Sequence, residues 1–447
     1  MRWYRVLRPT FVLMLAASVA LAQPPPPPPP LTPLPPPLQP PGNPVTPAKA
    51  NLGKTLFWDE QVSSTRTVAC GSCHQARVGG SDPRSVLASA HAINPGPDAL
   101  TGTPDDILGS PGVVLNTASG AYAWSAVFGL AEQVTGRTTP SHINAAYSPR
   151  QFWDGRAEGA FIDPETGDTL ITLGGALENQ VLAPPVSSVE MGHIGRDWAD
   201  VAARLTTAMP LALSPVVPAA LVDWLGQRNY PQLFAEAFGT AAVTAARIAM
   251  AIASYERTLF STQTPFDAEI AGTPSFTPQE RNGFQLFGQL GCAGCHAGAL
   301  TSDNQFHYTG VRPAAEDSGR AAVTHLIVDL GRMRTPSLRN VSLRPAFMHD
   351  GRFTTLEQVV DFYDRGGDFD APNKAPGVRP LNLTPLQKAA LAAFMRRPLT
   401  DPRVASATAP FDQPALYRES SRQHRKSERP GRVSRRTGRP HRSGDVR

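Results

Sequence analysis

The sequence predicts a mainly α-helical protein with little β structure, organised in two domains. The chain has 447 residues, of which 41% are hydrophobic, so it is long enough to bury a sizeable core. Its clearest periodic segments have helical spacing, whereas no alternating strand-like run is long or regular. A short cysteine motif occurs twice, at positions far enough apart to lie in different domains.

The first 22 residues have the organisation of a secretory signal peptide. Three arginines lie within the first eight residues, and residues 11–21 form an apolar stretch too short to span a bilayer comfortably. Residues 20–22 read Ala-Leu-Ala, which is a typical cleavage site. We therefore expect cleavage after Ala22, a periplasmic or otherwise exported protein, and no membrane span after removal of the signal. A short membrane anchor is the alternative interpretation.

Two segments of biased composition flank the predicted domains. Residues 23–47 form a proline-rich linker, with 15 prolines among the 24 positions from 24 to 47, and we expect an extended spacer there. Residues 403–447 are expected to form a basic disordered tail, because the last 31 residues hold 11 Lys and Arg against 3 Asp and Glu. The net charge of +5 comes from this tail and the signal arginines. Because the protein is expected to be exported from the cytoplasm, we expect no nucleic-acid partner.

All four cysteines lie in two CxxCH motifs. The motifs consist of Cys70, Cys73 and His74, and of Cys292, Cys295 and His296. A zinc site, a redox dithiol or a disulfide-stabilised binding protein uses such pairs, but none of these accounts for the histidine after each pair. Haem attachment accounts for every residue, because the two thiols bond the vinyl groups and the histidine reaches the iron. We predict two covalently bound c-type haems.

The segments ahead of the two motifs resemble each other. Thr277 and Pro278, with Glu280 three residues after the cap, form a capping box that opens a helix. Thr46 and Pro47 open a similar stretch. Both stretches share a T-P…G…L-F pattern before their CxxCH motif, which indicates an internal duplication.

Two further helices are predicted from spacing and start signals. Ile248, Ile252, Tyr255 and Leu259 recur with a helical period. Another Thr-Pro pair, at residues 384–385, opens a helix that ends near Phe394. With the two haem motifs, these helices favour an all-helical pair of domains.

Several motifs between and after the haem sites resemble those of the bacterial di-haem cytochrome c peroxidase/MauG family. They are, in family order, QFWDGRAEG, SVEMG, SYERTLFSTQTPFD, RTPSLRNVSLRPAFMHDGRF and LEQVVDFYDRGG, and the resemblance spans roughly residues 48–400. The resemblance implies two cytochrome c-like domains. We expect an N-terminal domain with the peroxidatic haem at 48–240 and a C-terminal electron-transfer haem domain at 241–402.

The resemblance also implies roles for residues around the first haem. Glu190 of the EMG motif matches the distal acid/base, and Gln180 matches a glutamine of the same pocket. Cleavage of a bound O–O bond needs a proton moved from one oxygen to the other, which a nearby carboxylate provides. Trp153 matches the tryptophan that passes electrons between the haems, although most tryptophans are core residues. His91 is a candidate to cap the first iron at rest, or is an ordinary loop histidine.

The second haem departs from the peroxidases proper at its sixth ligand. Those enzymes have a methionine where this chain has Tyr363, and MauG-like members use a tyrosine there. A phenolate ligand stabilises ferric and higher oxidation states, whereas a thioether favours ferrous iron. Met348 and Met333 are rival ligands, and His349 is expected to support a haem propionate or a backbone group. The resemblance also implies a calcium ion between the domains. Whether this chain binds calcium stays open, because Thr138 stands where the family usually has an asparagine.

The resulting function is an exported di-haem peroxidase. Hydrogen peroxide is reduced at the N-terminal haem, with electrons relayed through the C-terminal haem from a small cytochrome c or another electron-donor protein. One alternative is a MauG-like enzyme that oxidises tryptophan on a partner protein. The other is a non-catalytic di-haem electron carrier, which would have no need of Glu190 above an open iron.

Overall fold

The computed structural model describes residues 31–87 and 89–419, and the predicted signal peptide lies outside them. The described chain contains helices α1 (Pro47–Trp58), α2 (Cys70–Cys73), α3 (Ala176–Val181), α4 (Trp198–Thr207), α5 (Ala219–Leu225), α6 (Tyr230–Phe238), α7 (Ala245–Glu256), α8 (Pro265–Ile270), α9 (Pro278–Gln289), α10 (Ala321–Thr324), α11 (Leu356–Asp364), α12 (Pro385–Met395) and α13 (Pro402–Ser406). Its strands are β1 (Ile93–Asn94), β2 (Ile107–Leu108), β3 (Pro111–Val114), β4 (Glu132–Val134), β5 (Phe161–Ile162), β6 (Thr169–Ile171), β7 (Phe306–His307) and β8 (Met333–Arg334).

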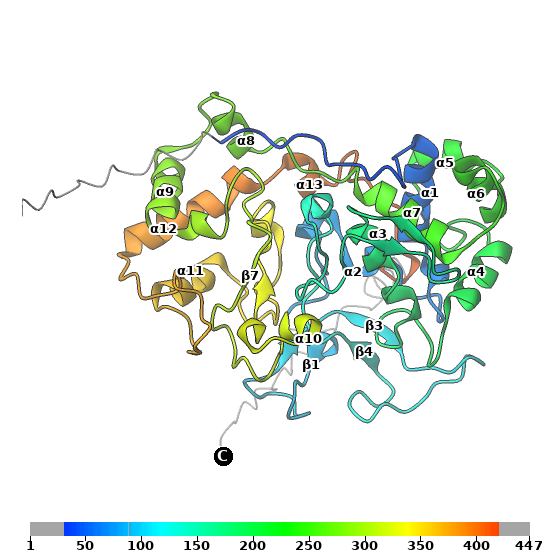
Figure 1. Ribbon diagram of the computed structural model, residues 1–447, viewed down its shortest axis with the longest axis horizontal. Coiled ribbons are helices and arrows are strands. Elements are labelled where there is room, and N and C mark those ends of the chain that lie inside the picture. The colour runs from blue at the N-terminus through cyan, green and yellow to red at the C-terminus, as the bar shows by residue number, and fades with distance from the viewer. Residues whose placement is uncertain (1–30, 88, 420–447) are drawn as a thin grey trace, which may run out of the picture. The chain divides into compact units, whose positions relative to one another are not determined.

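The prediction of a mainly α-helical fold with little β structure is confirmed. The strands are at most four residues long and pair in order as four antiparallel two-stranded sheets. The helices are joined by long connections that contain short 3₁₀ turns (Figure 1). Among the described helices, none combines the length and the apolar character needed to cross a membrane.

Helices α1 and α7 form the first of two closely packed helix pairs. The Thr46 side chain caps α1 by accepting a hydrogen bond from the backbone N–H of Lys49, and Pro47 occupies the first helical position. At the crossing, a Cβ atom on Gly53 would lie 1.9 Å from the carbonyl oxygen of Ala251. The two helices can approach this closely because residue 53 has no side chain.

Helices α9 and α12 form the second pair, which repeats the first. The predicted capping box of Thr277 and Glu280 is present at the start of α9. A Cβ atom on Gly283 would lie 2.0 Å from the carbonyl oxygen of Ala390 in α12. Each pair therefore has a glycine at its crossing, followed by Leu-Phe three residues later, and the repeated sequence pattern corresponds to a repeated packing.

Helix α7 covers most of the segment predicted from its apolar spacing, but it ends at Glu256, before Leu259. It lies beyond the expected domain boundary at residue 240, yet it packs on α1 and α3. The first core consists of buried residues from α1, α4, α6 and α7, with Leu52, Phe57, Leu205, Phe234 and Ile248 among them. In the second half, the rings of Phe266, Phe276, Phe284, Phe287 and Phe394 pack against one another.

The described part of the proline-rich segment lies against the folded body (Figure 1, dark blue). Residues 32–46 contain no helix or strand, but Pro37 and Pro40 are buried. The Tyr147 hydroxyl donates to the carbonyl oxygen of Pro35 at 2.6 Å. The buried Asn43 amide donates to Glu178 at 2.8 Å. This part of the expected linker is therefore fixed to the first half by polar contacts.

The start of the expected C-terminal tail differs from the prediction. Residues 403–419 include most of α13, and Phe411 and Leu416 are buried among the apolar residues of the first core. The backbone N–H of Tyr417 donates to the Glu60 carboxylate at 2.7 Å. Buried apolar side chains and polar contacts together hold this segment, which precedes the strongly basic part of the predicted tail. The rest of the predicted tail, from residue 420, lies outside the described residues.

Candidate active site

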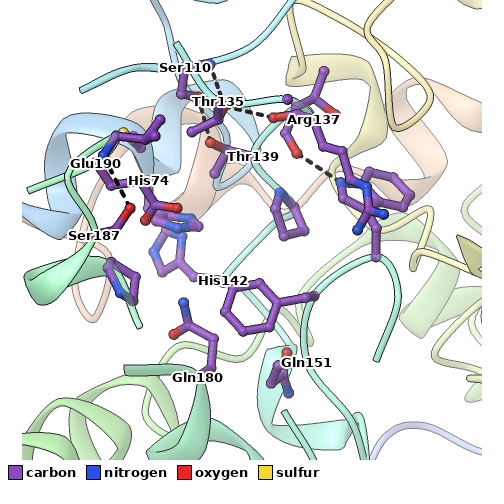
Figure 2. A pocket seen from close by; sticks show the side chains of 18 of the residues that line it. His74, Ser110, Thr135, Arg137, Thr139, His142, Gln151, Gln180, Ser187 and Glu190 are labelled. Carbon is purple, nitrogen blue, oxygen red and sulfur yellow. Dashed lines mark hydrogen bonds between the residues drawn. The ribbon is translucent and has the colours of Figure 1, made fainter. Parts of the chain in front are cut away.

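The first CxxCH motif opens onto a cavity of 770 Å³ in the N-terminal half (Figure 2). The short helix α2 carries both cysteines, and His74 is the residue that ends it. Gly71 of this helix lies directly against the Trp58 ring, where a Cβ atom would be 2.2 Å from the nearest ring carbon. The packing of α2 on α1 therefore fixes the motif at the edge of the cavity.

The imidazole of His74 is oriented for metal binding. Its Nδ1 atom lies 3.2 Å from the carbonyl oxygen of Gly80, and a carbonyl can only accept a hydrogen bond. The proton therefore sits on Nδ1, and Nε2 keeps a free lone pair. Burial lowers the pKa of His74 to about 4, so the ring is neutral near pH 7.

A second buried imidazole accompanies His74, and sequence reasoning missed it. The rings of His142 and His74 lie 5.3 Å apart between centroids, and His142 Nδ1 is 3.3 Å from the same Gly80 oxygen. Burial lowers the pKa of His142 to about 3. His142 lies in the TPSHIN segment, but nothing in its spacing shows that this loop folds back onto the haem motif.

The predicted acid Glu190 and the predicted Gln180 line the same cavity as His74 (Figure 2). Strand β3 holds the Glu190 loop, because the backbone N–H of Val113 donates to the Glu190 carbonyl at 3.1 Å. A Cβ atom on Gly112 would lie 1.9 Å from the carbonyl oxygen of Val189, so the strand fits closely against the loop. Burial raises the pKa of Glu190, and the Arg156 guanidinium partly opposes that shift.

A second carboxyl group, Glu256, also lines this cavity and was missed from the sequence. The residue is 5% exposed, and its Oε2 atom has no hydrogen-bond partner among the described residues. Burial raises the pKa of Glu256 to about 8, so this carboxyl group is protonated near pH 7. One signal was available: Glu256 lies four residues after Ile252 and therefore on the apolar face of the predicted helix.

Trp153 lines the first cavity and also a second one, on the side of the C-terminal half. The side chain is 7% exposed, and its Nε1–H donates to the carbonyl oxygen of Thr138 at 2.8 Å. Its ring centroid lies 6.3 Å from that of His349. The tryptophan predicted to connect the haems thus lies in the wall that the two cavities share, together with Pro140, Ser141 and Ala145.

The second CxxCH motif opens onto this second cavity, which has a volume of 240 Å³. His296 repeats the arrangement of His74, since its Nδ1 atom lies 3.1 Å from the carbonyl oxygen of Thr301. Phe287 lies 6.3 Å from the His296 ring, as Phe57 lies 6.1 Å from His74. Both histidines are therefore held by equivalent partners.

All the candidate sixth ligands of the second haem lie at the second cavity. Tyr363 of α11, Met333 and Met348 line it together with both cysteines, and so does His349, which is predicted to support a haem propionate or a backbone group. Burial raises the pKa of the Tyr363 hydroxyl, so the free phenol is neutral near pH 7 and needs a cation to ionise. A ferric iron provides such a charge. No carboxylate lines this cavity among the described residues.

The structure does not bring His91 to the first haem motif. This residue lies in the 3₁₀ turn Ala90–Ala92, is exposed, and lines neither cavity. The candidate iron ligand is therefore separated from His74, while His142 takes the place beside it.

The residues present fit a haem better than a zinc ion. Burial raises the pKa of the Cys70 thiol to about 12, with Glu256 and Glu190 adding to the shift, and raises the pKa of Cys73 as well. A structural zinc site is closed around the ion by its ligands, whereas these two cysteines and their histidine lie at a cavity of 770 Å³. Two neutral thiols and a histidine with a free Nε2, at the mouth of a large cavity, are the donor set of a c-type haem.

Comparisons with known proteins agree with this geometry. The family model described as "Di-haem cytochrome c peroxidase" matches residues 47–275, and a cytochrome c model matches residues 280–397. The methylamine utilization protein MauG of Methylorubrum extorquens is 29% identical over 373 residues, covering 82% of each chain. The cytochrome-c peroxidase IdrP1 of Denitromonas iodatirespirans is 29% identical over 409 residues, covering 84% of this chain and 88% of the relative.

Solved structures show the same fold. A MauG-like protein associated with microbial copper homeostasis has a TM-score of 0.59 and 25% identity, with 85% of this chain and 96% of that chain covered. The diheme peroxidase BthA from Burkholderia thailandensis E264 has a TM-score of 0.53 and 23% identity, with 83% and 91% covered.

Two histidine-bearing cavities, each built on a glycine-crossed helix pair, define a haem protein of the c-type class. The chain belongs to the di-haem cytochrome c peroxidase family. It is therefore a haem-containing oxidoreductase, a peroxidase of the di-haem type, and the resemblance inferred from its motifs is confirmed.

Proposed function

We propose that this chain is an exported enzyme that reduces hydrogen peroxide in its first cavity, with electrons relayed through the second. The observation that carries the proposal is the joint position of Glu190, Gln180 and His74 around one cavity. Two covalent haems would be held by the cysteines of the two motifs and by Nε2 of His74 and His296. The haem supplies the iron that takes the peroxide and stores the oxidising equivalents.

Glu190 would move the proton that O–O cleavage requires. Reduction of hydrogen peroxide to two waters consumes two electrons and two protons. A carboxyl group with a raised pKa can accept a proton from the inner oxygen and return it to the departing one. The Gln180 amide would orient the peroxide by hydrogen bonding, and the neutral Glu256 would hold a further proton within the same cavity.

Trp153 would carry electrons between the cavities. It lines both, and its hydrogen bond to Thr138 fixes the ring plane at one orientation. The electrons would come from a small cytochrome c or another electron-donor protein. His91 would have to leave its exposed position to cap the first iron at rest.

Tyr363 supports a second candidate function. It lines the second cavity, where a phenolate ligand would keep the haem in its oxidised states and make it a poor acceptor from an ordinary cytochrome c. The enzyme would then be MauG-like and withdraw electrons from a tryptophan of a partner protein. Reduced cytochrome c as the test donor separates the two candidates, since only the first predicts steady turnover.

The remaining assignments follow the expected organisation. The signal peptide would be cleaved after Ala22, which leads to a periplasmic or otherwise exported protein. The two haem domains would cover residues 48–240 and 241–402, with α7 contributing to the first core from beyond that boundary.

The experiment that tests this function is rapid mixing of the holoprotein with hydrogen peroxide, followed in the haem Soret band. The ferric and the one-electron-reduced forms are both used. Glu190→Gln should slow the reaction by about 10²- to 10⁴-fold, because the amide cannot transfer the proton. Glu236→Gln, at an exposed residue of α6, is the matched control and should react as wild type does.

Equal rates for Glu190→Gln and wild type would remove Glu190 from the proposal. A wild-type protein that stays unchanged by peroxide in both redox states would leave the electron carrier as the function.

A further inference from the structure

Arg137 joins two carboxylates that come from different halves of the chain. Its Nη1 atom lies 2.7 Å from Oδ2 of Asp154, in the N-terminal half. Its Nε and Nη2 atoms lie 2.8 and 2.6 Å from the two oxygens of Asp317, in the C-terminal half. The three side chains are largely buried, with 21%, 7% and 13% of their surface exposed. The bidentate contact to Asp317 uses the fixed geometry of a guanidinium.

The next residue, Thr138, links the same region to both haem sites. Its backbone N–H donates to the carbonyl oxygen of His349 at 2.7 Å, and its hydroxyl donates to that of Met348 at 2.8 Å. Its own carbonyl accepts the Trp153 Nε1–H at 2.8 Å. Residues 137–138 therefore connect the tryptophan between the cavities to the loop that lines the second cavity.

This arrangement does not fit the calcium ion that the family resemblance implies. Calcium takes six to eight oxygen ligands. The residue at the usual asparagine position is Thr138, which lacks the amide oxygen of an asparagine, and its hydroxyl donates to the carbonyl oxygen of Met348. Both nearby carboxylates are paired with guanidinium groups, Asp317 with Arg137 and Asp154 with Arg137 and Arg156, and neighbouring carboxylates keep the pKa of Arg137 well above its ordinary value. A divalent cation at these carboxylates would have to displace their guanidinium partners, because the carboxylate oxygens are already engaged by them.

We propose that Arg137 is a built-in cation that takes the place of an interdomain calcium ion and positions Trp153 between the two haem sites. Arg137 is a positioning residue in this proposal, because it acts on the electron path through Asp154, Asp317 and Thr138. The effect on electron transfer rests on the proposed relay. The predicted independence of the protein's stability from calcium does not rest on that relay.

The first test is calcium dependence of the holoprotein. Thermal unfolding and calcium titration calorimetry are carried out after chelation, and then with added calcium. The wild type should show no calcium binding and no shift in its midpoint. A midpoint that falls on chelation and recovers with calcium would overturn the proposal, whatever the enzyme's activity.

The second test is a set of variants that weaken the bridge. Arg137→Ala and Asp317→Asn should slow electron transfer between the haems by about tenfold or more, since a small displacement of a reacting group has effects of this size. Arg137→Lys should be intermediate, because an ammonium cannot pair with both carboxylates bidentately. Arg150→Ala, which removes an exposed pairing with Glu158, is the matched control.

Two readouts separate positioning from general damage. Because Arg137 also lines the first cavity, the test is a ratio: in Arg137→Lys the later change at the second haem should be slowed more than the initial peroxide reaction at the first haem. Near-ultraviolet circular dichroism should report an altered Trp153 environment in Arg137→Ala. Unchanged transfer in all three bridge variants would contradict the proposal. A wild type that fails to react with peroxide would refute the proposed function alone, since the calcium test still decides the role of Arg137.

Discussion

The two haem sites share a framework and differ in what lines them. Each has a helix pair crossed at a glycine, a phenylalanine about 6 Å from the motif histidine, and a backbone carbonyl at that histidine's Nδ1. The first cavity has a volume of 770 Å³ and is lined by carboxyl groups, including Glu190 and Glu256. The second has 240 Å³, no carboxylate among its described lining residues, and Tyr363 at its wall.

The comparison shows that the helix pair that holds each haem motif is similar in the two halves, while the side chains that line each cavity differ. The repeated helix pair decides where each histidine and its cysteines lie. The lining comes partly from the pair, since α7 supplies Glu256, and partly from outside it, since the Glu190 loop lines the first cavity and α11 with Tyr363 lines the second. A large acidic cavity suits a reactant that needs protons, whereas a small one suits electron transfer.

The largest predicted loss of stability comes from removing one buried arginine from each half, which tests whether the two halves are supported in equivalent ways. Arg257 pairs with Glu178 at 2.7 Å in the first half, and Arg339 pairs with Asp267 at 2.6 Å in the second. Arg257→Met and Arg339→Met should each lower the free energy of unfolding by about 3–5 kcal/mol, because a buried carboxylate loses its partner. Denaturant unfolding of the holoprotein measures this loss.

The control for both arginine variants is Arg150→Met, at a pair that is roughly half exposed. It should change the free energy of unfolding by less than about 1 kcal/mol. If Arg257→Met and Arg339→Met lowered the free energy of unfolding no more than this control does, the two buried ion pairs would not be needed to stabilise the two halves.

The next largest loss of stability is expected from substitution of the glycines at the two helix crossings. Gly53→Ala and Gly283→Ala should each destabilise the protein by about 1–3 kcal/mol, because the new methyl group meets a backbone carbonyl and the helices must separate. Gly288→Ala, in the same helix as Gly283 but with nothing within 4 Å, should instead stabilise by about 0.5–1 kcal/mol. Thermal unfolding compares all three. A loss for only one crossing glycine would break the equivalence of the two halves.

A further prediction concerns the acidic lining of the first cavity and is a dependence of stability on pH rather than a fixed loss. The pKa of Glu256 is raised to about 8, so between its ordinary value and about pH 8 the folded protein binds one more proton than the unfolded chain. The free energy of unfolding should therefore fall as pH rises through this window, by up to about 1.4 kcal/mol for each pH unit. Glu256→Gln should remove this slope from unfolding curves measured at several pH values. Equal slopes for the two proteins would show that Glu256 ionises freely.

The sequence allowed the local features of both sites to be predicted. The capping box at Thr277, the haem motifs, and the positions of Glu190, Gln180 and Trp153 at the first cavity all follow from residues close together in the chain or from family motifs. Tyr363 was also predicted to face the second haem motif, and it lies at that cavity.

Features that depend on distant segments were not predicted. Arg137 and Asp317 are 180 residues apart, and no local pattern indicates that they pair. His142 reaches His74 through a loop, and Phe411 is buried although it lies within the predicted C-terminal tail, whose basic residues are concentrated from Arg418 onward. Glu256 lies on the apolar face of the predicted helix, but most glutamates are exposed to solvent, so this position alone does not predict a buried carboxyl group. Long-range packing, rather than composition, decides these contacts.

The most direct test of the difference between the two sites is low-temperature electron paramagnetic resonance of the ferric holoprotein, with and without stoichiometric peroxide. Wild type is compared with Tyr363→Met. We predict one high-spin or labile signal from the first haem, and one low-spin signal from the second that changes in Tyr363→Met, with both signals altered by peroxide. Two low-spin signals that respond neither to the substitution nor to peroxide, even after one-electron reduction, would contradict an open first site and a tyrosine-ligated second one.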